Sequence, residues 1–440
     1  MSNNKNLSIN LITSVFTFIV TILFSFFLSP YLVKHVGVEA NGFVTLANNA
    51  IQIISIISIA INSMSSRFIT IELVSGNLKK ANEYYSSTFF GNVLVFLITV
   101  IPVTLIIIFL EKFIQVSPSL VSSVKILFTL CFLNYYLNTC TPNFQVAIFS
   151  QNKLYLQSIG TLAQNILKIS LICLMFGLLP VDIVTIGIAT LVATLFYQIF
   201  LFVAKERLLS SLKVSVKWIK WRRLWEIVSS GFWNSINQIS LLMLQELDVL
   251  IANVLLGVTD MGIIAIVKIV PITMSSLAAT LSNLFMPTLT ITFAKNDLKG
   301  MKKELFKAGK LMLLFLTIPY AGFICFGNAF FKLWMPELDA NQLVMLSVIS
   351  SLSLFFTFGI QPLYQVFGVI NRLKENSLVI FASGILTLLV EIILLKTTNL
   401  GLIAICGVSS VISILKNMLF VVPFGGKYLG FKKRTFFPLV

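Results

Sequence analysis

The sequence predicts an all-α, polytopic membrane protein with about twelve transmembrane helices in two pseudo-symmetric lobes of six. Three observations predict this fold class. Hydrophobic residues make up 57% of the 440 positions and charged residues only 11%, with a mean hydropathy of +0.96. A soluble protein of this size would need far more charge on its surface. The other two observations are the distribution of the basic residues and a repeat with a long period.

The apolar residues come in runs of about 20, the length that a helix needs to cross ~30 Å of hydrocarbon. The first run is too long for a signal-peptide core, and no small-residue cleavage site follows it, so we expect it to stay as a helix. The runs at 260–294 and 341–370 are long, and Pro271, Pro287 and Pro362 mark expected kinks. The twelve predicted spans are 7–32, 43–67, 88–110, 121–149, 155–177, 183–204, 227–256, 260–294, 311–331, 341–370, 376–396 and 401–423.

The basic residues predict the orientation of these spans. With a cytoplasmic N-terminus, the cytoplasmic segments carry 24 of the 32 Lys and Arg residues, and the outer segments carry five. Positive charge collects on the cytoplasmic side of membrane proteins, so both termini are expected there, and the protein in the cytoplasmic membrane. Most of the net charge of +16 is then a topology signal with attraction to anionic membrane lipids. No nucleic-acid partner is expected, because no basic stretch lies on a soluble domain.

A repeat with an offset of 220 residues divides the chain. The segment HVGVEANGF (35–43) aligns with LLGVTDMGI (255–263), which pairs Gly37 with Gly257. The same gapless offset aligns ITIELVSGNLKK (69–80) with LTITFAKNDLKG (289–300), PNFQV (142–146) with PLYQV (362–366), and Gly187 with Gly407. Each copy has an even number of spans, so both enter the membrane from the same side, as a parallel repeat.

The repeat predicts three parts of the chain. These are an N-terminal six-helix lobe at 1–204, a basic cytoplasmic linker at 205–226 and a C-terminal six-helix lobe at 227–440. The sequence ends in FFPLV at 436–440, which is typical of the beginning of another apolar run, so the second lobe is interpreted as one that could continue in further helices.

Enzymatic and metal chemistry have little support in the sequence. All five cysteines lie within predicted spans without metal-ligand spacing, and the chain has a single histidine. No loop exceeds about 25 residues, so no extramembrane domain is available to carry a reaction. We therefore expect a transporter, with no cofactor and no metal.

Polar residues at helical spacing form faces on six of the predicted spans. One interpretation is that these groups hydrogen-bond neighbouring helices and hold the bundle together. The other is a shared, water-filled cavity whose amide and hydroxyl walls suit a hydroxyl-rich ligand such as a sugar. The candidate cavity residues from these faces are Asn48, Gln52, Asn62, Asn134, Gln145, Gln238, Asp248 and Gln361.

Basic residues inside spans are the other candidates, because each intramembrane charge costs ~2.5–3.5 kcal/mol unless it is paired or hydrated. They are Lys168, Lys268, Lys416 and Arg67. As ammonium groups bind phosphate well, the lysines would attract an anionic head group. This hypothesis predicts that Lys168→Ala or Lys268→Ala reduces export while the protein stays folded.

The acidic residues leave an alternative open. Lys168 or Lys268 could form a structural ion pair with Asp248 or Glu246. Glu391, near the outer end of its span, could equally extend to the outer surface.

The run SPYLVKHVGVEANGFVTLANN (29–49) and the segment INSMSSRFITIELVSGNLKKANEYYSS (61–87) resemble polysaccharide repeat-unit flippases. These are the Wzx-type members of the multidrug/oligosaccharidyl-lipid/polysaccharide (MOP) exporter superfamily, which also contains the MATE transporters. The resemblance covers the whole chain in topology and repeat, and its specific part is roughly the first 90 residues. Asn41 departs from the pattern, since an aromatic residue is expected before Gly42.

The resemblance implies a flippase that moves undecaprenyl-diphosphate-linked oligosaccharides across the bacterial cytoplasmic membrane by alternating access. The products would be capsule, exopolysaccharide or O-antigen, and the implied partners include a polysaccharide polymerase and glycosyltransferases as well as membrane lipids. Some relatives carry two further helices. The family has no strict catalytic signature, so no residue role is carried over.

Three alternatives remain at this point. A cation-coupled multidrug exporter would share the fold and would use acids such as Glu246 and Asp248 for H⁺ or Na⁺. A lipid II flippase would share the diphosphate of the ligand. An integral-membrane polymerase would need a larger outer loop or a paired acidic motif, and the outer loops here are about 5–13 residues long without such a motif.

Overall fold

The structure is a computed structural model that describes residues 16, 20, 26–151, 153–283, 285, 289, 292–293, 295–370 and 372–439. Every regular element in the described part of the chain is helical, and no strand occurs there. The predicted all-α fold class is therefore confirmed. Most of the first predicted span, 7–32, and Pro287 lie outside the described residues.

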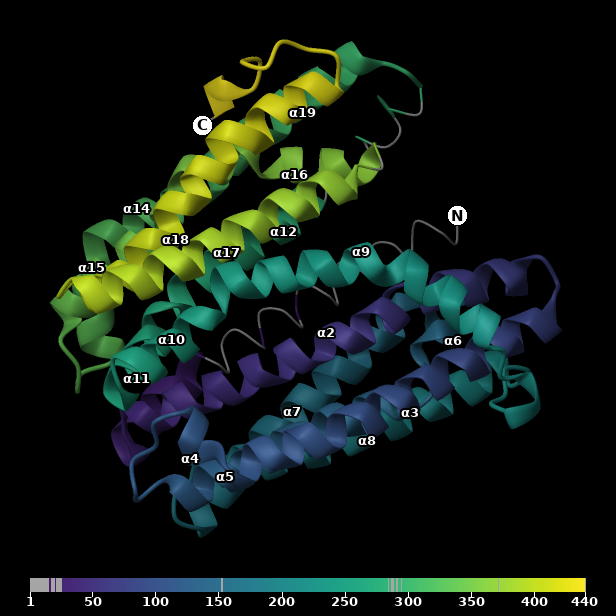
Figure 1. Ribbon diagram of the computed structural model, residues 1–440, viewed down its shortest axis with the longest axis horizontal. Coiled ribbons are helices and arrows are strands. Elements are labelled where there is room, and N and C mark those ends of the chain that lie inside the picture. The colour runs from purple at the N-terminus through teal and green to yellow at the C-terminus, as the bar shows by residue number, and fades with distance from the viewer. Residues whose placement is uncertain are drawn as a thin grey trace. The chain divides into compact units, whose positions relative to one another are not determined.

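The chain divides into two compact units, Met1–Ser235 and Ile236–Val440. The first unit contains a helical stretch at 26–36 and the elements α2 (Val38–Val74), α3 (Leu78–Ile108), α4 (Leu110–Phe113), α5 (Val121–Thr139), α6 (Gln145–Ser150), α7 (Leu154–Leu178), α8 (Ile183–Leu209), the 3-10 turn η1 (Val216–Trp218) and most of α9 (Trp221–Gln245). Within it, α2 packs along α3, and both α5 and α7 pack along α8 (Figure 1).

The second unit contains the end of α9 and the rest of the chain. Its elements are α10 (Leu247–Leu255), α11 (Val258–Val267), α12 (Ile269–Asn283), α14 (Leu298–Trp334), α15 (Ala340–Thr357), η2 (Phe358–Ile360), α16 (Gln361–Val369), α17 (Leu373–Thr397), α18 (Leu402–Lys416), the π-helical turn η3 (Asn417–Val421), α19 (Val422–Tyr428) and η4 (Phe437–Leu439). Here α18 packs against α15 and α17, and α15 packs against α14 (Figure 1). The predicted lobe and linker boundaries, 1–204, 205–226 and 227–440, stay a prediction.

Nine helices in the described residues are long and apolar enough to cross a membrane. The count becomes ten if α9 and α10, which meet at a bend of 43°, form one broken span. The sequence thus folds into the multi-span helical bundle of an integral membrane protein.

Two of the long spans break four residues before a proline. Proline lacks an N–H and its ring clashes with the carbonyl of the residue four positions earlier. Helix α11 ends at Val267, four residues before Pro271, and η2 interrupts the next such span at Phe358, four residues before Pro362. The regular α-helix is therefore interrupted at two of the prolines that the sequence marks as places for a kink.

The 220-residue repeat recurs in the backbone at helix starts. Gly37 precedes α2 with φ 103°, and Gly257 precedes α11 with φ 134°. Gly76 and Asn296, which the same offset pairs, also have positive φ, at 74° and 54°. The next residue in each copy then caps a helix through its side chain. Asn77 accepts a hydrogen bond from the N–H of Lys80 at 3.3 Å, and Asp297 accepts one from the N–H of Gly300 at 2.8 Å. Paired positions of the two copies thus form the same type of turn before a helix.

Gly37→Ala is expected to destabilise the folded protein by ~1–2 kcal/mol, because an L-residue in this left-handed region is strained. An added Cβ would meet no atom within 4 Å, so the loss would come from the backbone alone. The measurement is the melting temperature of the purified protein in detergent. Gly177→Ala in α7 is the matched control, since its Cβ would also meet no atom within 4 Å and its φ is not positive. An unchanged melting temperature for Gly37→Ala would contradict the expected strain.

Candidate functional site

A small pocket in the second unit brings two lysines and six serines together. Lys268 is the C-cap residue of α11, directly after Val267, and Lys416 is the last residue of α18. The pocket has a volume of about 100 Å³. Its hydroxyl groups belong to Ser275, Ser350, Ser353, Ser409, Ser410 and Ser413. Ammonium and hydroxyl groups are donors to anionic oxygens, so the lining suits a phosphate-like group.

The broken backbone of α11 and α12 positions Lys268. Pro271 interrupts the hydrogen-bond ladder just after this residue, and the side chain is buried at 7% exposure. Its ammonium forms an ion pair with the carboxylate of Asp248 in α10, which is fully buried. The structural ion pair that the sequence left open is therefore present for Lys268, although this lysine also lines the pocket.

Glu391 of α17 joins this buried group of charges. Its side chain is fully buried, so it does not extend to the surface as one sequence-based alternative had it. Its charge interacts with those of Asp248 and Lys268, while neither carboxylate oxygen has a hydrogen-bond partner among the described residues. Cys406 of α18 is the further titratable neighbour of the group. The second unit thus buries one ion pair, Lys268 with Asp248, and a further carboxyl group, Glu391, whose electrostatics are influenced by both.

Lys416 differs from Lys268 in its surroundings. It is half-buried and lies 5.7 Å from the centre of the Tyr364 ring, in a cation–π contact. No carboxylate lies within ion-pairing distance of it among the described residues. Lys416 is therefore the ammonium in this pocket that can turn to an incoming anion without breaking an ion pair.

A second polar pocket lies in the first unit, with a volume of about 260 Å³. Six side-chain amides line it, and none of the described side chains that line it is charged. The amides come from α2, α3, the end of α5, the α5–α6 connection, α6 and α8. They are Asn62, Asn92, Asn138, Asn143, Gln145 and Gln198.

Hydrogen bonds hold several of these amides in place. Asn62 and Asn92 donate to each other's oxygens at 3.2 and 3.0 Å. Gln198 donates to the Asn138 oxygen at 2.8 Å, and Asn143 donates to Ser65 at 3.0 Å. The bonds join different elements of the first unit, which orients part of the pocket lining before a ligand binds.

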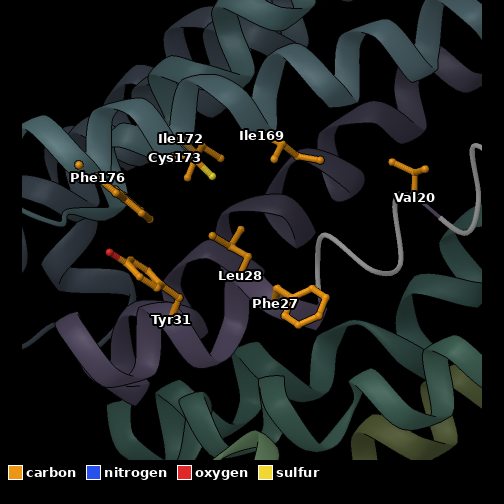
Figure 2. Close-up of a pocket in the computed structure, with 9 residues that line it drawn as sticks. Val20, Phe27, Leu28, Tyr31, Ile169, Ile172, Cys173 and Phe176 are labelled. Atoms are coloured by element: carbon orange, nitrogen blue, oxygen red, sulfur yellow. The ribbon is translucent and has the colours of Figure 1, made fainter.

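A third pocket, with a volume of about 560 Å³, is apolar (Figure 2). Figure 2 shows Leu28 and Tyr31 facing Ile172 and Phe176 of α7 across it. The Tyr31 and Phe176 rings stack at a centroid distance of 5.3 Å. None of its described lining residues is charged, so it offers no binding groups for phosphate.

The predicted site residues fall into three groups in the structure. Lys268 and Lys416 line the lysine–serine pocket, with Asp248 behind Lys268, and Asn62 and Gln145 line the amide pocket. The remaining seven line neither of these two pockets. They are Lys168, Arg67, Asn48, Gln52, Asn134, Gln238 and Gln361.

Several of these seven have other surroundings. Lys168 of α7 is partly buried in the neighbourhood of Cys131 of α5. Arg67 is exposed on α2. Asn48 donates to the carbonyl of Val44 one turn earlier at 2.9 Å, so its amide bonds within its own helix.

The candidate residues predicted from the sequence include two of the six pocket amides, Asn62 and Gln145, and miss most of the serines. Asn92 and Gln198 were not among the candidates, because each is the single amide of its apolar segment and forms no polar face. Asn143 was not among them because it lies off the helical spacing of the polar residues in its predicted span. The serine spacing was a usable signal, since Ser409, Ser413 and Lys416 follow each other at intervals of four and three on α18.

No protein-family model matches the sequence. The chain is 27% identical over 429 residues to the uncharacterized membrane protein EpsK of Bacillus subtilis, covering 98% of this chain and 85% of that protein. It superposes with a TM-score of 0.75 on an inward-facing multidrug resistance MATE family transporter of the MOP superfamily, at 13% identity and 94% coverage of both chains.

A second solved structure is a MOP superfamily transporter from Pyrococcus furiosus, described as having a binding pocket of reverse polarity that suggests a different function. Its TM-score is 0.68, at 12% identity, with 97% of this chain and 96% of that chain covered. At sequence identities of 12–13%, the two solved structures indicate the fold of this chain but not its function. The protein is thus an integral membrane protein with the fold of the MATE transporters of the MOP superfamily.

Proposed function

We propose that this protein is a flippase for undecaprenyl-diphosphate-linked oligosaccharides in the bacterial cytoplasmic membrane, working by alternating access. The observation that carries the proposal is the lysine–serine pocket. Its two ammonium groups and the hydroxyls of four serines suit a diphosphate, whereas a pocket for cationic drugs would need acidic or aromatic walls. The other two serines, Ser409 and Ser410, already donate to backbone carbonyls. The amide pocket adds walls suited to sugar hydroxyls.

The products would be capsule, exopolysaccharide or O-antigen. A polysaccharide polymerase and glycosyltransferases would then act on the same lipid-linked substrate, and the lipid tail would stay in the bilayer. A lipid II flippase would bind the same diphosphate, so the assay must vary the sugar as well as the lipid.

Flipping can be measured directly in liposomes that contain the purified protein and a fluorescent polyprenyl-diphosphate disaccharide. A membrane-impermeant quencher then bleaches only the outer leaflet. The proposal expects bleaching to proceed beyond the outer-leaflet fraction when the protein is present. Bleaching that stops at the level of protein-free liposomes would reject the proposal. Replacement of the disaccharide by the lipid II head group tests the closest alternative.

Lys416→Met is expected to weaken binding of inorganic pyrophosphate at least about tenfold, since a charge-assisted contact contributes ~1.5–3 kcal/mol. The melting temperature should stay near that of the wild type, because no ion-paired partner of Lys416 is stranded. Isothermal titration calorimetry on the detergent-solubilised protein gives the affinity. Lys396→Met, an exposed lysine of α17, is the matched control. Equal affinity in Lys416→Met and Lys396→Met would remove Lys416 from the site.

A multidrug exporter is the second candidate, and the buried acids favour it. Asp248 and Glu391 are both fully buried in the second unit, where a coupling cation could bind. This candidate expects the protein to drive efflux of a cationic dye such as ethidium when it is overproduced. Dye efflux without flipping would favour the exporter, and flipping without dye efflux the flippase.

A further inference from the structure

The amide pocket of the first unit has a lining that suits only one chemical part of the proposed substrate. Among the described residues it holds six amides and two side-chain hydroxyls, from Ser66 and Thr141, but no charged side chain. An amide both donates and accepts hydrogen bonds, as a sugar hydroxyl does. A neutral wall of this kind has no preference for a phosphate or an ammonium ion. The ligand chemistry that it matches is a neutral ring with many hydroxyl groups.

The size of the pocket also limits the ligand. Its volume of about 260 Å³ lies just below the range of ~300–1,000 Å³ that is usual for drug-sized ligands. The ring of Phe144 and the side chain of Leu201 supply apolar surface beside the amides. Sugar rings have apolar C–H faces as well as hydroxyl edges, so a mixed wall fits one sugar unit of a longer oligosaccharide.

The backbone at this pocket supports a binding role. Helix α5 ends at Thr139 and α6 begins at Gln145, and the residues between them are not helical. Non-helical backbone at membrane depth is tolerated only where protein buries it or where it lines a water-filled cavity. Asn143, in this break, lines the pocket.

The break also recurs in the second copy. Pro142 lies within it, and Pro362, 220 residues later, follows the interruption at η2. Interrupted spans at equivalent positions of two repeats are the sequence feature that best marks binding sites in transporters. The amide pocket thus lies at an interrupted span, which is where transporters commonly place their binding sites.

We infer that this amide pocket is a carbohydrate subsite, which binds one neutral sugar unit through Asn62, Asn138 and Gln198. The inference rests on the proposed function, and it separates sugar recognition in the first unit from diphosphate binding in the second. The Gln198 amide donates a hydrogen bond of 2.8 Å to the Asn138 oxygen, and each of the two amide groups can form further hydrogen bonds to a ligand. A sugar hydroxyl can therefore join this network without displacing it.

The test uses saturation-transfer NMR on the full chain in lipid nanodiscs, which contain no sugar detergent. The probes are the methyl glycosides of glucose, galactose and N-acetylglucosamine, with glucuronate and glucosamine as charged counterparts. At least one neutral glycoside should give a signal, and the charged counterparts should bind more weakly. Asn138→Ala and Gln198→Ala should each weaken binding about threefold to tenfold, the effect of one lost hydrogen bond.

Two controls separate this subsite from general damage. Asn134→Ala removes an amide one turn earlier on α5 that does not line the pocket, and it should leave sugar binding unchanged. Lys416→Met should also leave sugar binding unchanged while it weakens pyrophosphate binding. If the amide variants fail to fold, Thr141→Val keeps every amide and removes one lining hydroxyl, and it should still weaken binding.

Each result decides the inference. Neutral sugars that bind equally to the wild type and to the pocket variants, or that do not bind at all while flipping proceeds, overturn the subsite and leave the proposed function standing. Sugar binding that depends on the amides in a protein that does not flip the lipid-linked substrate supports the subsite and removes the proposed function.

Discussion

Lys268→Ala is expected to lower the free energy of unfolding by ~3–5 kcal/mol, the effect of removing one partner of a buried ion pair. Asp248 is fully buried and its carboxylate pairs with Lys268, so the alanine variant would leave a buried acid without its cation. Glu391 is buried beside it and adds a second acid to the same group. The folded yield and the melting temperature in detergent should both fall.

A double variant distinguishes the loss of a pair from the loss of a binding residue. Asp248→Asn with Lys268→Gln removes both charges and keeps similar volumes, so it should recover most of the stability that Lys268→Ala loses. Pyrophosphate binding to this folded double variant then reports what Lys268 contributes to the pocket. Lys396→Ala, at an exposed position, is the control for loss of a lysine. A Lys268→Ala protein that melts at the wild-type temperature would contradict the importance of the pair.

This expectation differs from the one that the sequence alone supports. From the sequence, Lys268→Ala should reduce export in a protein that stays folded, because the lysine is treated as a free cation in a cavity. The ion pair changes this for Lys268, since its loss acts on folding first. Lys416, without an ion-paired partner in the described residues, is the better substitution for testing anion binding.

The sequence predicts the fold well because its strongest signals are local. Apolar runs set the helices, and the glycines at 37 and 257 are required by positive φ at the start of equivalent helices. Prolines 271 and 362 break helices four residues earlier by a local steric effect, whereas Pro102 and Pro319 lie inside continuous helices. Such features can be recognised without knowing which helices are neighbours.

The sites are less predictable because they depend on which helices meet. Asn48 and Asn62 share a predicted polar face of α2, yet Asn48 bonds to its own backbone and Asn62 bonds to Asn92 of α3. Helical spacing cannot distinguish these outcomes. Asn92 and Gln198 join the amide pocket only because α3 and α8 pack in the same unit. Their contribution follows from packing between segments far apart in the chain.

Gly231→Ala tests the packing that carries the amide pocket, and we expect a severe loss of folded protein. A Cβ at this position in α9 would lie 2.0 Å from the carbonyl oxygen of Ala60 in α2, a backbone atom that no rotamer change can move. Overpacking of a well-packed interior costs ~1–3 kcal/mol and sometimes more, and a backbone clash belongs at the upper end. Gly322→Ala in α14, whose Cβ would meet no atom within 4 Å, is the matched control and should gain slightly in helix propensity.

The same substitution has a functional consequence where enough protein folds. Ala60 precedes Asn62 by two residues on α2, so relief of the clash must shift the part of the helix that holds Asn62 against Asn92. Sugar binding should then weaken in Gly231→Ala while pyrophosphate binding in the second unit stays at the wild-type level, because the lysine–serine pocket contains no residue of α2 or α3. Calorimetry with pyrophosphate and NMR with the methyl glycosides measure the two effects on one sample. Equal loss of binding for both ligands would show that the variant damages the protein as a whole. If both ligands still bind and the stability equals that of the wild type, α9 and α2 are not packed as closely as the contact between Gly231 and Ala60 indicates.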